Sequence, residues 1–174
     1  MPHALPLPTI IDIEASGFGR GSYPIEVGFI LPDGSSFCTL IRPEADWQHW
    51  DDNAERIHGV ERSVLQVHGK PVGEVCQEIN RRLHGQSVYS DGWSHDYSWL
   101  GRLFDAAGSF PVFHLKDLRE LLGPCEQALW HATRDETETR LNMRRHRAST
   151  DARILQETLR VTRLQCAMQP AQLD

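Results

Sequence analysis

Residues 9–14 read TIIDIE and follow Pro8, and this run of β-branched residues is typical of a buried strand. Alternate side chains of a strand point to the same face, so Asp12 and Glu14 project together. Two neighbouring carboxylates raise each other's pKa unless a cation neutralises them. Oxygen ligands of this kind suit Mg²⁺ or Mn²⁺. The other interpretation is a strand end at which both acids are solvated.

Around this strand, the pattern predicts one sheet flanked by helices, an α/β fold. A glycine-rich turn leads to strands at 25–31 and 36–41, and the three strands are expected to form an antiparallel meander. The remaining expected elements are helices at 51–57, 61–67 and 72–83, a strand at 87–90, a helix at about 95–107, a strand at 111–115, and helical stretches at 116–122, 124–141 and 149–164. No linker interrupts this order, so we expect a single domain with a core of about 8–165 and short tails.

A third carboxylate, Asp96, lies where the strand at 87–90 ends and the next helix begins. Acids in a first helical turn are commonly explained by capping or by the helix dipole. The competing interpretation is a site residue, because ligand sites in α/β sheets gather outside strand ends. Asp91 lies in the same turn and is the alternative candidate.

The third group of interest is HRASTDA at residues 146–152. Asp151 falls in the first turn of the last helix, where Ser149 or Thr150 would serve as its N-cap. Capping explains Asp151 and leaves His146 unexplained. A histidine ionises near neutral pH, so an imidazole beside a bound water is suited to general base catalysis.

Composition narrows the classes of partner and compartment. The net charge of −6 lacks the basic excess of proteins that grip long duplex DNA, which favours a few local contacts with any nucleic acid. No apolar run approaches the ~20 residues needed to span a bilayer, and the first residues do not resemble a secretory signal. The four cysteines lie about 40 residues apart, which argues against a zinc site and against a disulfide framework. We therefore expect a cytoplasmic protein.

With these residues in view, the chain resembles the DEDDh (DnaQ-like) 3′–5′ exonucleases of the ribonuclease H-like fold. The first motif of that family, D-x-E followed by small residues and a glycine, matches residues 12–17. Its second motif places an aspartate before an aromatic-leucine pair, which matches Asp96 and Trp99-Leu100. Its third motif, H-x-A-x-x-D-A, is matched in full by residues 146–152.

Two secondary matches extend the resemblance over about residues 10–159. Residues 57–60, IHGV, are similar to the family's I-H-G-I segment, and residues 25–28, IEVG, to its second strand. In one departure, many relatives carry an asparagine a few residues before the second-motif aspartate, where this chain has Asp91. The downstream Trp-Leu pair favours Asp96 as the ligand, with Asp91 in a supporting place.

The resemblance implies a five-stranded mixed sheet, with an antiparallel meander plus parallel strands, flanked by helices. It implies two-metal hydrolysis of a 3′-terminal phosphodiester with Mg²⁺ or Mn²⁺, releasing nucleoside 5′-monophosphates. Asp12 would bridge both cations, Glu14 and Asp151 would complete one, Asp96 would support the other, and His146 would be the general base. The expected substrate-binding residues are Ala15, Ser16, Gly17, Phe18, His58 and Trp93.

The implied partners are 3′ ends of single-stranded RNA or DNA, or short oligonucleotides, and no membrane. Two alternatives stay open: a module that binds nucleic-acid ends without hydrolysis, and a phosphodiesterase acting on dinucleotides. The sequence leaves open the sugar preference and whether the protein is a homodimer.

Overall fold

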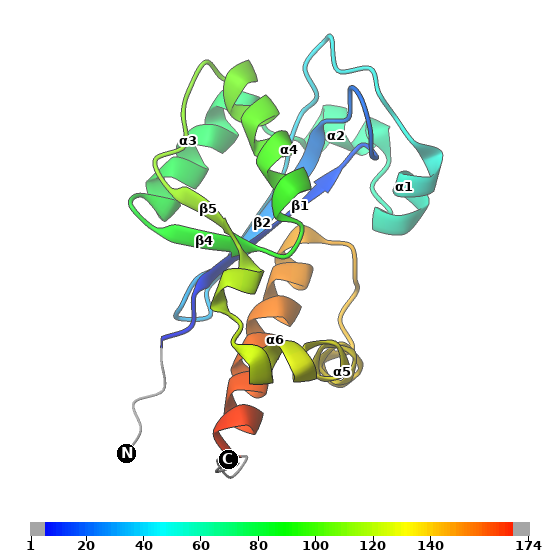
Figure 1. The fold of residues 1–174 in the computed structure, drawn as a ribbon. Coiled ribbons are helices and arrows are strands. Elements are labelled where there is room, and N and C mark those ends of the chain that lie inside the picture. Colours follow the sequence, from blue (N-terminus) through cyan, green and yellow to red (C-terminus); the bar gives the residue numbers. More distant parts are fainter. Residues whose placement is uncertain (1–5, 169–174) are drawn as a thin grey trace.

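A computed structural model of the chain describes residues 6–168, and the expected tails fall mostly on residues 1–5 and 169–174, outside this range. Figure 1 shows a sheet with helices packed on both sides, which confirms the predicted α/β architecture. The elements are β1 (Thr9–Ala15), β2 (Pro24–Ile30), β3 (Ser36–Leu40), α1 (Asp52–His58), α2 (Arg62–His68), α3 (Val72–Leu83), β4 (Ser87–Ser90), α4 (Trp93–Ala106), β5 (His114–Asp117), a 3₁₀ turn (Leu118–Leu121), α5 (Pro124–Leu141) and α6 (Ala148–Met168).

The sheet is mixed and has the strand order β3-β2-β1-β4-β5. Strands β1, β2 and β3 form the predicted antiparallel meander, whereas β4 runs parallel to β1 and β5 runs parallel to β4. Strand β1 is therefore the central strand, and β4 pairs with its first residues and runs in the same direction, so that β4 ends beside the middle of β1. Acidic residues from these two chain segments are brought to one edge of the sheet.

Alternation along β1 divides the core into two layers. Ile11 and Ile13 pack into the larger cluster, which α3 and α4 cover, whereas Ile10 packs into a smaller cluster under α5 and α6. Asp12 and Glu14 share the α6 face with Ile10 because side chains alternate in a strand. The predicted common direction of the two carboxylates is thus present.

Helix α6 crosses β2 at Gly28. A Cβ on Gly28 would lie 2.2 Å from the backbone nitrogen of Ser149 and 2.6 Å from the carbonyl carbon of Ala148. No side chain fits between strand and helix at this point. Gly28 therefore determines how closely the first turn of α6, which carries Asp151, approaches the sheet.

We expect Gly28→Ala to destabilise the protein by about 1–3 kcal/mol, because backbone atoms of α6 must move to admit one methyl group. Denaturant unfolding measures the change. Gly73→Ala is the matched control, since a Cβ at that position of α3 meets nothing within 4 Å. Alanine there should be neutral or stabilising by up to about 1 kcal/mol. Equal stability of the Gly28→Ala variant and the wild type would contradict the close packing described here.

Two elements that follow α4 in the chain differ from the sequence-based expectations in their bounds or type. The last strand was expected at 111–115 but lies at His114–Asp117, because Phe113 is buried in the core and the ladder with β4 begins only at His114. The predicted helix at 116–122 is a short 3₁₀ turn over Leu118–Leu121. Both errors concern where β5 begins and ends, which is decided by its pairing with β4 and not by the local sequence.

The prediction that the cysteines form no disulfide was wrong. Cys125 in the first turn of α5 and Cys166 near the end of α6 form a disulfide with Cα atoms 6.0 Å apart, whereas Cys38 and Cys76 are free. The 41-residue separation gave no local signal, and the packing of α5 against α6 brings the two residues together. Among residues 6–168, no helix combines the length and the apolarity that crossing a membrane would require.

Candidate active site

The first part of the candidate site is the end of β1. Asp12 and Glu14 are half-buried between backbone neighbours that are fully covered. Strand β2 pairs with both residues on one side, with Asp12 opposite Gly28 and Glu14 opposite Glu26. The two carboxylates therefore project from a rigid, paired segment.

The second part is the start of α4. Asp96 lies in its first turn, is 3% exposed, and accepts a hydrogen bond from the Ser90 hydroxyl at the end of β4. Its backbone N–H donates to the carbonyl of Gly92. A helix start and a strand end together fix this carboxylate.

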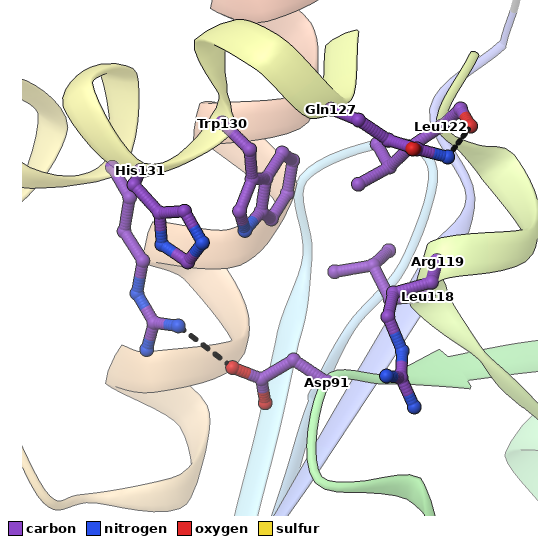
Figure 2. A pocket seen from close by; sticks show the side chains of 8 residues that line it. Asp91, Leu118, Arg119, Leu122, Gln127, Trp130 and His131 are labelled. Atoms are coloured by element: carbon purple, nitrogen blue, oxygen red, sulfur yellow. Dashed lines mark hydrogen bonds and ion pairs between the residues drawn. The ribbon is translucent and has the colours of Figure 1, made fainter. Parts of the chain in front are cut away.

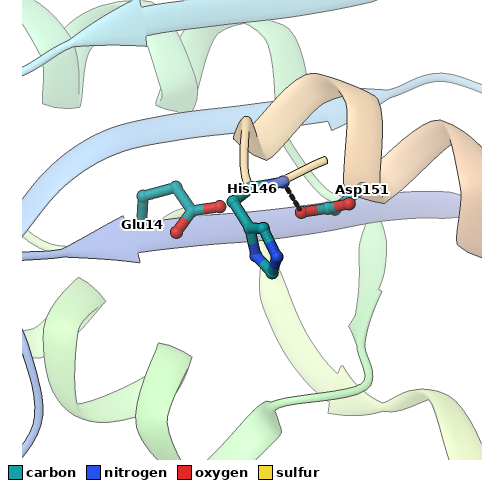
Figure 3. A group of neighbouring side chains, drawn as sticks. All are labelled: Glu14, His146 and Asp151. Atoms are coloured by element: carbon teal, nitrogen blue, oxygen red, sulfur yellow. Dashed lines mark hydrogen bonds between the residues drawn. The ribbon is translucent and has the colours of Figure 1, made fainter. Parts of the chain in front are cut away.

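The third part is the connection between α5 and α6. His146 has a positive φ of 60°, and its backbone N–H donates to Asp151 Oδ2 at 2.9 Å. Ligand atoms of Glu14, His146 and Asp151 all lie within 4.8 Å of one another, as Figure 3 illustrates. Ser149 and Thr150 lie inside the helix, which begins at Ala148, so neither is the N-cap considered above.

Glu26 is a residue whose structural role the sequence analysis missed. Its side chain is fully buried on β2, and it accepts hydrogen bonds from Arg147 Nε at 3.0 Å and from the backbone N–H of Ala148 at 2.9 Å. This carboxylate therefore caps α6 from another element and fixes the residue that follows His146. An acid in the middle of the apolar run at residues 25–31 was the available signal.

The carboxylates of the site resist ionisation in the absence of a cation. Burial, followed by the charges of Asp96, Glu14 and Asp151, raises the pKa of Asp12 well above its ordinary value. Burial and the charge of Asp151 raise the pKa of Glu14 to about 7, and burial raises the pKa of Asp96 to about 7. Burial also raises the pKa of Asp151. Nearby arginines offset these effects only in part, and a bound cation would favour the ionised form of the acids.

The donor set fits divalent cations. Asp151 Oδ1 is buried and has no hydrogen-bond partner within the described part of the chain, and the nearest cationic atom, Arg145 Nε, is 3.7 Å away. Leaving a buried oxygen without a hydrogen-bond or metal partner costs free energy, so such an oxygen indicates that a bound group satisfies it. Carboxylate oxygens are the ligands that Mg²⁺ and Mn²⁺ prefer. The residues present therefore fit the expected cations.

A cavity of about 440 Å³, the catalytic cavity, opens over these acids. Its rim carries an aromatic group, because the ring of Phe18 packs 5.1 Å from that of His95 and 5.8 Å from that of Trp99. Phe18 is nevertheless 68% exposed and so offers a free face. The predicted site residues that line the cavity are Asp12, Glu14, Ala15, Gly17, Phe18, His58, Asp96 and His146.

Two of the predicted substrate-binding residues lie outside this lining. Ser16 is fully buried, where its hydroxyl accepts from the N–H of Tyr23 and shares a hydrogen bond with His49. The indole of Trp93 donates to the carbonyl of Leu115 instead. Asp91, the alternative to Asp96, pairs with Arg134 at 2.8 Å and lines a different cavity (Figure 2).

Comparison with known proteins shows the fold. No protein-family model matches the sequence, and no curated protein matches it. The structure resembles a moderately thermophilic exonuclease I from Methylocaldum szegediense, with a TM-score of 0.65 and 15% identity over 92% of this chain and 41% of that one. It also resembles Escherichia coli exonuclease I in a zinc-bound complex with single-stranded DNA, with a TM-score of 0.70 and 14% identity over 93% of this chain and 42% of that one.

A third solved structure, E. coli exonuclease I with a dA16 oligonucleotide, gives a TM-score of 0.67 and 13% identity over 90% of this chain and 41% of that one. The chain thus spans about two fifths of the length of the solved proteins it matches. The chain therefore shares its fold with the matching parts of these exonuclease I structures, in agreement with the predicted ribonuclease H-like fold.

Proposed function

We propose that this chain is a metal-dependent 3′–5′ exonuclease of the DEDDh type, with residues 8–165 as a single nuclease domain. It hydrolyses the terminal phosphodiester of RNA or short single-stranded nucleic acid and releases nucleoside 5′-monophosphates. One observation carries the proposal: ligand atoms of Glu14, His146 and Asp151 lie within 4.8 Å of one another, and the buried Asp151 Oδ1 has no hydrogen-bond partner among residues 6–168. Asp12 and Asp96 line the same cavity.

Asp12, Glu14, Asp96 and Asp151 would hold two divalent cations, Mg²⁺ or Mn²⁺. When bound, such cations stabilise charge on the attacking and leaving oxygens of a phosphodiester. His146 accepts the proton of the attacking water from a connection that Glu26 and Asp151 fix on either side. The water oxygen bonds to phosphorus as the bond between phosphorus and the 3′ oxygen of the preceding nucleotide breaks. That oxygen leaves with the shortened strand and takes up a proton from solvent.

His58 is placed to hold the terminal nucleotide. Its Nδ1 accepts from the backbone N–H of Val60 at 3.1 Å, so the ring proton lies on Nε2. Nε2 is buried without a partner among the described residues, and the ring lines the catalytic cavity. Burial lowers the pKa of His58, which keeps the ring neutral. The result is a neutral hydrogen-bond donor beside a group of acids.

We expect His58→Ala to raise KM about tenfold, which is the loss of one hydrogen bond worth about 1.4 kcal/mol. The value of kcat should change less, since the acids and His146 remain in place. Steady-state kinetics on a short oligonucleotide measures both parameters. His58→Gln keeps a side-chain donor, so its KM should lie between those of the wild type and His58→Ala. An unchanged KM in His58→Ala would show that His58 does not bind the substrate.

The proposed function is tested by digesting 5′-labelled single-stranded RNA and DNA of matched sequence with Mg²⁺ or Mn²⁺. We expect a ladder that shortens from the 3′ end, release of 5′-monophosphates, and no products in EDTA. Cleavage that persists in EDTA would overturn the metal mechanism. Turnover of dinucleotides alone would identify a dinucleotide phosphodiesterase, and tight binding without turnover would identify a binding module.

A further inference from the structure

A second cavity, of about 430 Å³, opens beside the catalytic cavity and is called the neighbouring cavity here. One turn of the chain separates the two: Asp91 lines the neighbouring cavity, whereas Gly92 and Asp96 line the catalytic one. The ion pair of Arg134 with Asp91 holds this wall to α5 (Figure 2). Residues 91 and 92, which are adjacent in the chain, therefore face different cavities, and only this short segment separates the two linings.

The floor of the neighbouring cavity is apolar. Leu118 and Leu122 close it from the segment after β5, and Trp130 projects into it from α5 (Figure 2). All three side chains belong to the core cluster under α6, so the floor is rigid. These side chains are at most 8% exposed, so they offer the edges of an apolar floor, and apolar contact with a nucleobase does not depend on its sequence.

The rim of the neighbouring cavity offers positive charge and hydrogen-bond donors. Arg119 is paired with Asp117 through Nε and Nη2, yet its side chain is 78% exposed at the edge of the cavity. His131 lies on α5 one turn after Gln127, which also lines the cavity. Its side chain is exposed and makes no hydrogen bond within residues 6–168. A phosphate and sugar lying over an apolar floor would meet these two side chains first.

We propose that the neighbouring cavity binds the nucleoside on the 5′ side of the scissile phosphate, with its base on the apolar floor and its backbone along Arg119 and His131. This inference rests on the proposed function. A strand with its last nucleotide in the catalytic cavity passes its scissile phosphate over the acids beside the wall at residues 91–92. The next nucleoside along the strand then reaches the cavity on the other side of that wall.

The test compares two substrates in the full chain. A 5′-phosphorylated dithymidylate carries the nucleoside in question, whereas the p-nitrophenyl ester of thymidine 5′-monophosphate replaces it with nitrophenol. For the double variant Arg119→Glu/His131→Ala, kcat/KM on the dinucleotide should fall about tenfold and stay within twofold on the ester. Arg81→Glu is the matched control, because Arg81 is also exposed and paired with one acid, Glu78, but lies on α3.

A second comparison addresses the base. A dinucleotide with an abasic 5′ residue should be cleaved about tenfold less efficiently than dithymidylate by the wild type, because apolar contact of the base with the floor is lost. Equal rates on the two dinucleotides, or equal losses of the double variant on dinucleotide and ester, would overturn the proposal.

If the wild type cleaves none of these substrates, the proposed function fails and the cavity is tested by binding alone. Fluorescence anisotropy with a 5′-labelled oligothymidylate then compares the double variant with Arg81→Glu. Weaker binding by the double variant only would support the cavity as a nucleoside site, and equal binding would overturn it.

Discussion

Asp12→Asn is expected to lower the hydrolysis rate by more than about 10⁴-fold, a larger loss than that from removing one general base. Asp12 lies on the central strand, and the charges of Asp96, Glu14 and Asp151 all act on it. An amide is nearly isosteric with the carboxylate but carries no charge to hold a cation. Digestion of a 5′-labelled oligonucleotide with Mg²⁺ measures the rate.

Asp105→Asn is the control for Asp12→Asn, because Asp105 is an exposed carboxylate on α4. Its rate should equal that of the wild type. An Asp12→Asn variant that retains more than a few per cent of the wild-type rate would place the cations elsewhere.

The same substitution is expected to stabilise the metal-free protein at pH 8. The folded-state pKa values of Asp12, Glu14 and Asp96 are raised, so the folded state binds more protons than the unfolded chain. The contribution of these groups to the free energy of unfolding is therefore fully present below pH ~4, the pKa of the acids in the unfolded chain. It is lost as the pH rises through about 7, their pKa in the folded state.

Thermal unfolding in EDTA checks this pH dependence. The wild type should melt at a lower temperature at pH 8 than at pH 5.5, and Asp12→Asn should raise the Tm at pH 8. For a chain of this length each 1 kcal/mol corresponds to about 2–4 °C. Adding Mg²⁺ at pH 8 should stabilise the wild type more than the variant. A metal-free wild type that becomes more stable from pH 5.5 to pH 8 would contradict the raised pKa values.

His146→Ala is expected to lower kcat by about 10²–10⁴-fold, the usual contribution of a general base. His146 lines the catalytic cavity, and the backbone hydrogen bond to Asp151 holds it there. The Mg²⁺ concentration that gives half-maximal rate should stay nearly the same, because four carboxylates remain. Rates measured over a Mg²⁺ titration separate the two effects.

His68→Ala is the control for His146→Ala, since His68 is an exposed histidine on α2. A ring nitrogen of His146 lies within 4.8 Å of carboxylate oxygens of Glu14 and Asp151, so His146 is also placed to be a metal ligand. A large rise in the Mg²⁺ requirement, with kcat restored at saturation, would assign His146 to the metal instead of to the water.

Local patterns predicted most of the fold and the candidate catalytic residues. Helix α3, strand β4 and helix α5 have the predicted bounds, because apolar periodicity and turn residues act over a few positions. The alternation in β1 correctly placed Asp12 and Glu14 on one face. The structure brings His146 and Asp151, which are distant in the sequence, close to Glu14.

Tertiary structure alone decided the features that depend on contacts between distant residues. In the sequence, Glu26 is only an acid within an apolar strand. Its role follows from the packing of α6, which places Arg147 and Ala148 against it. The disulfide of Cys125 with Cys166 forms because α5 packs against α6. The neighbouring cavity forms between α5 and the segment that follows β5. The sequence by itself determined which residue types can ionise, bind cations or fill a core, because these are properties of single side chains and short periods. Long-range packing decided which of these residues meet. A contact between two distant segments produces no periodic pattern in the sequence of either segment, so the sequence does not reveal it.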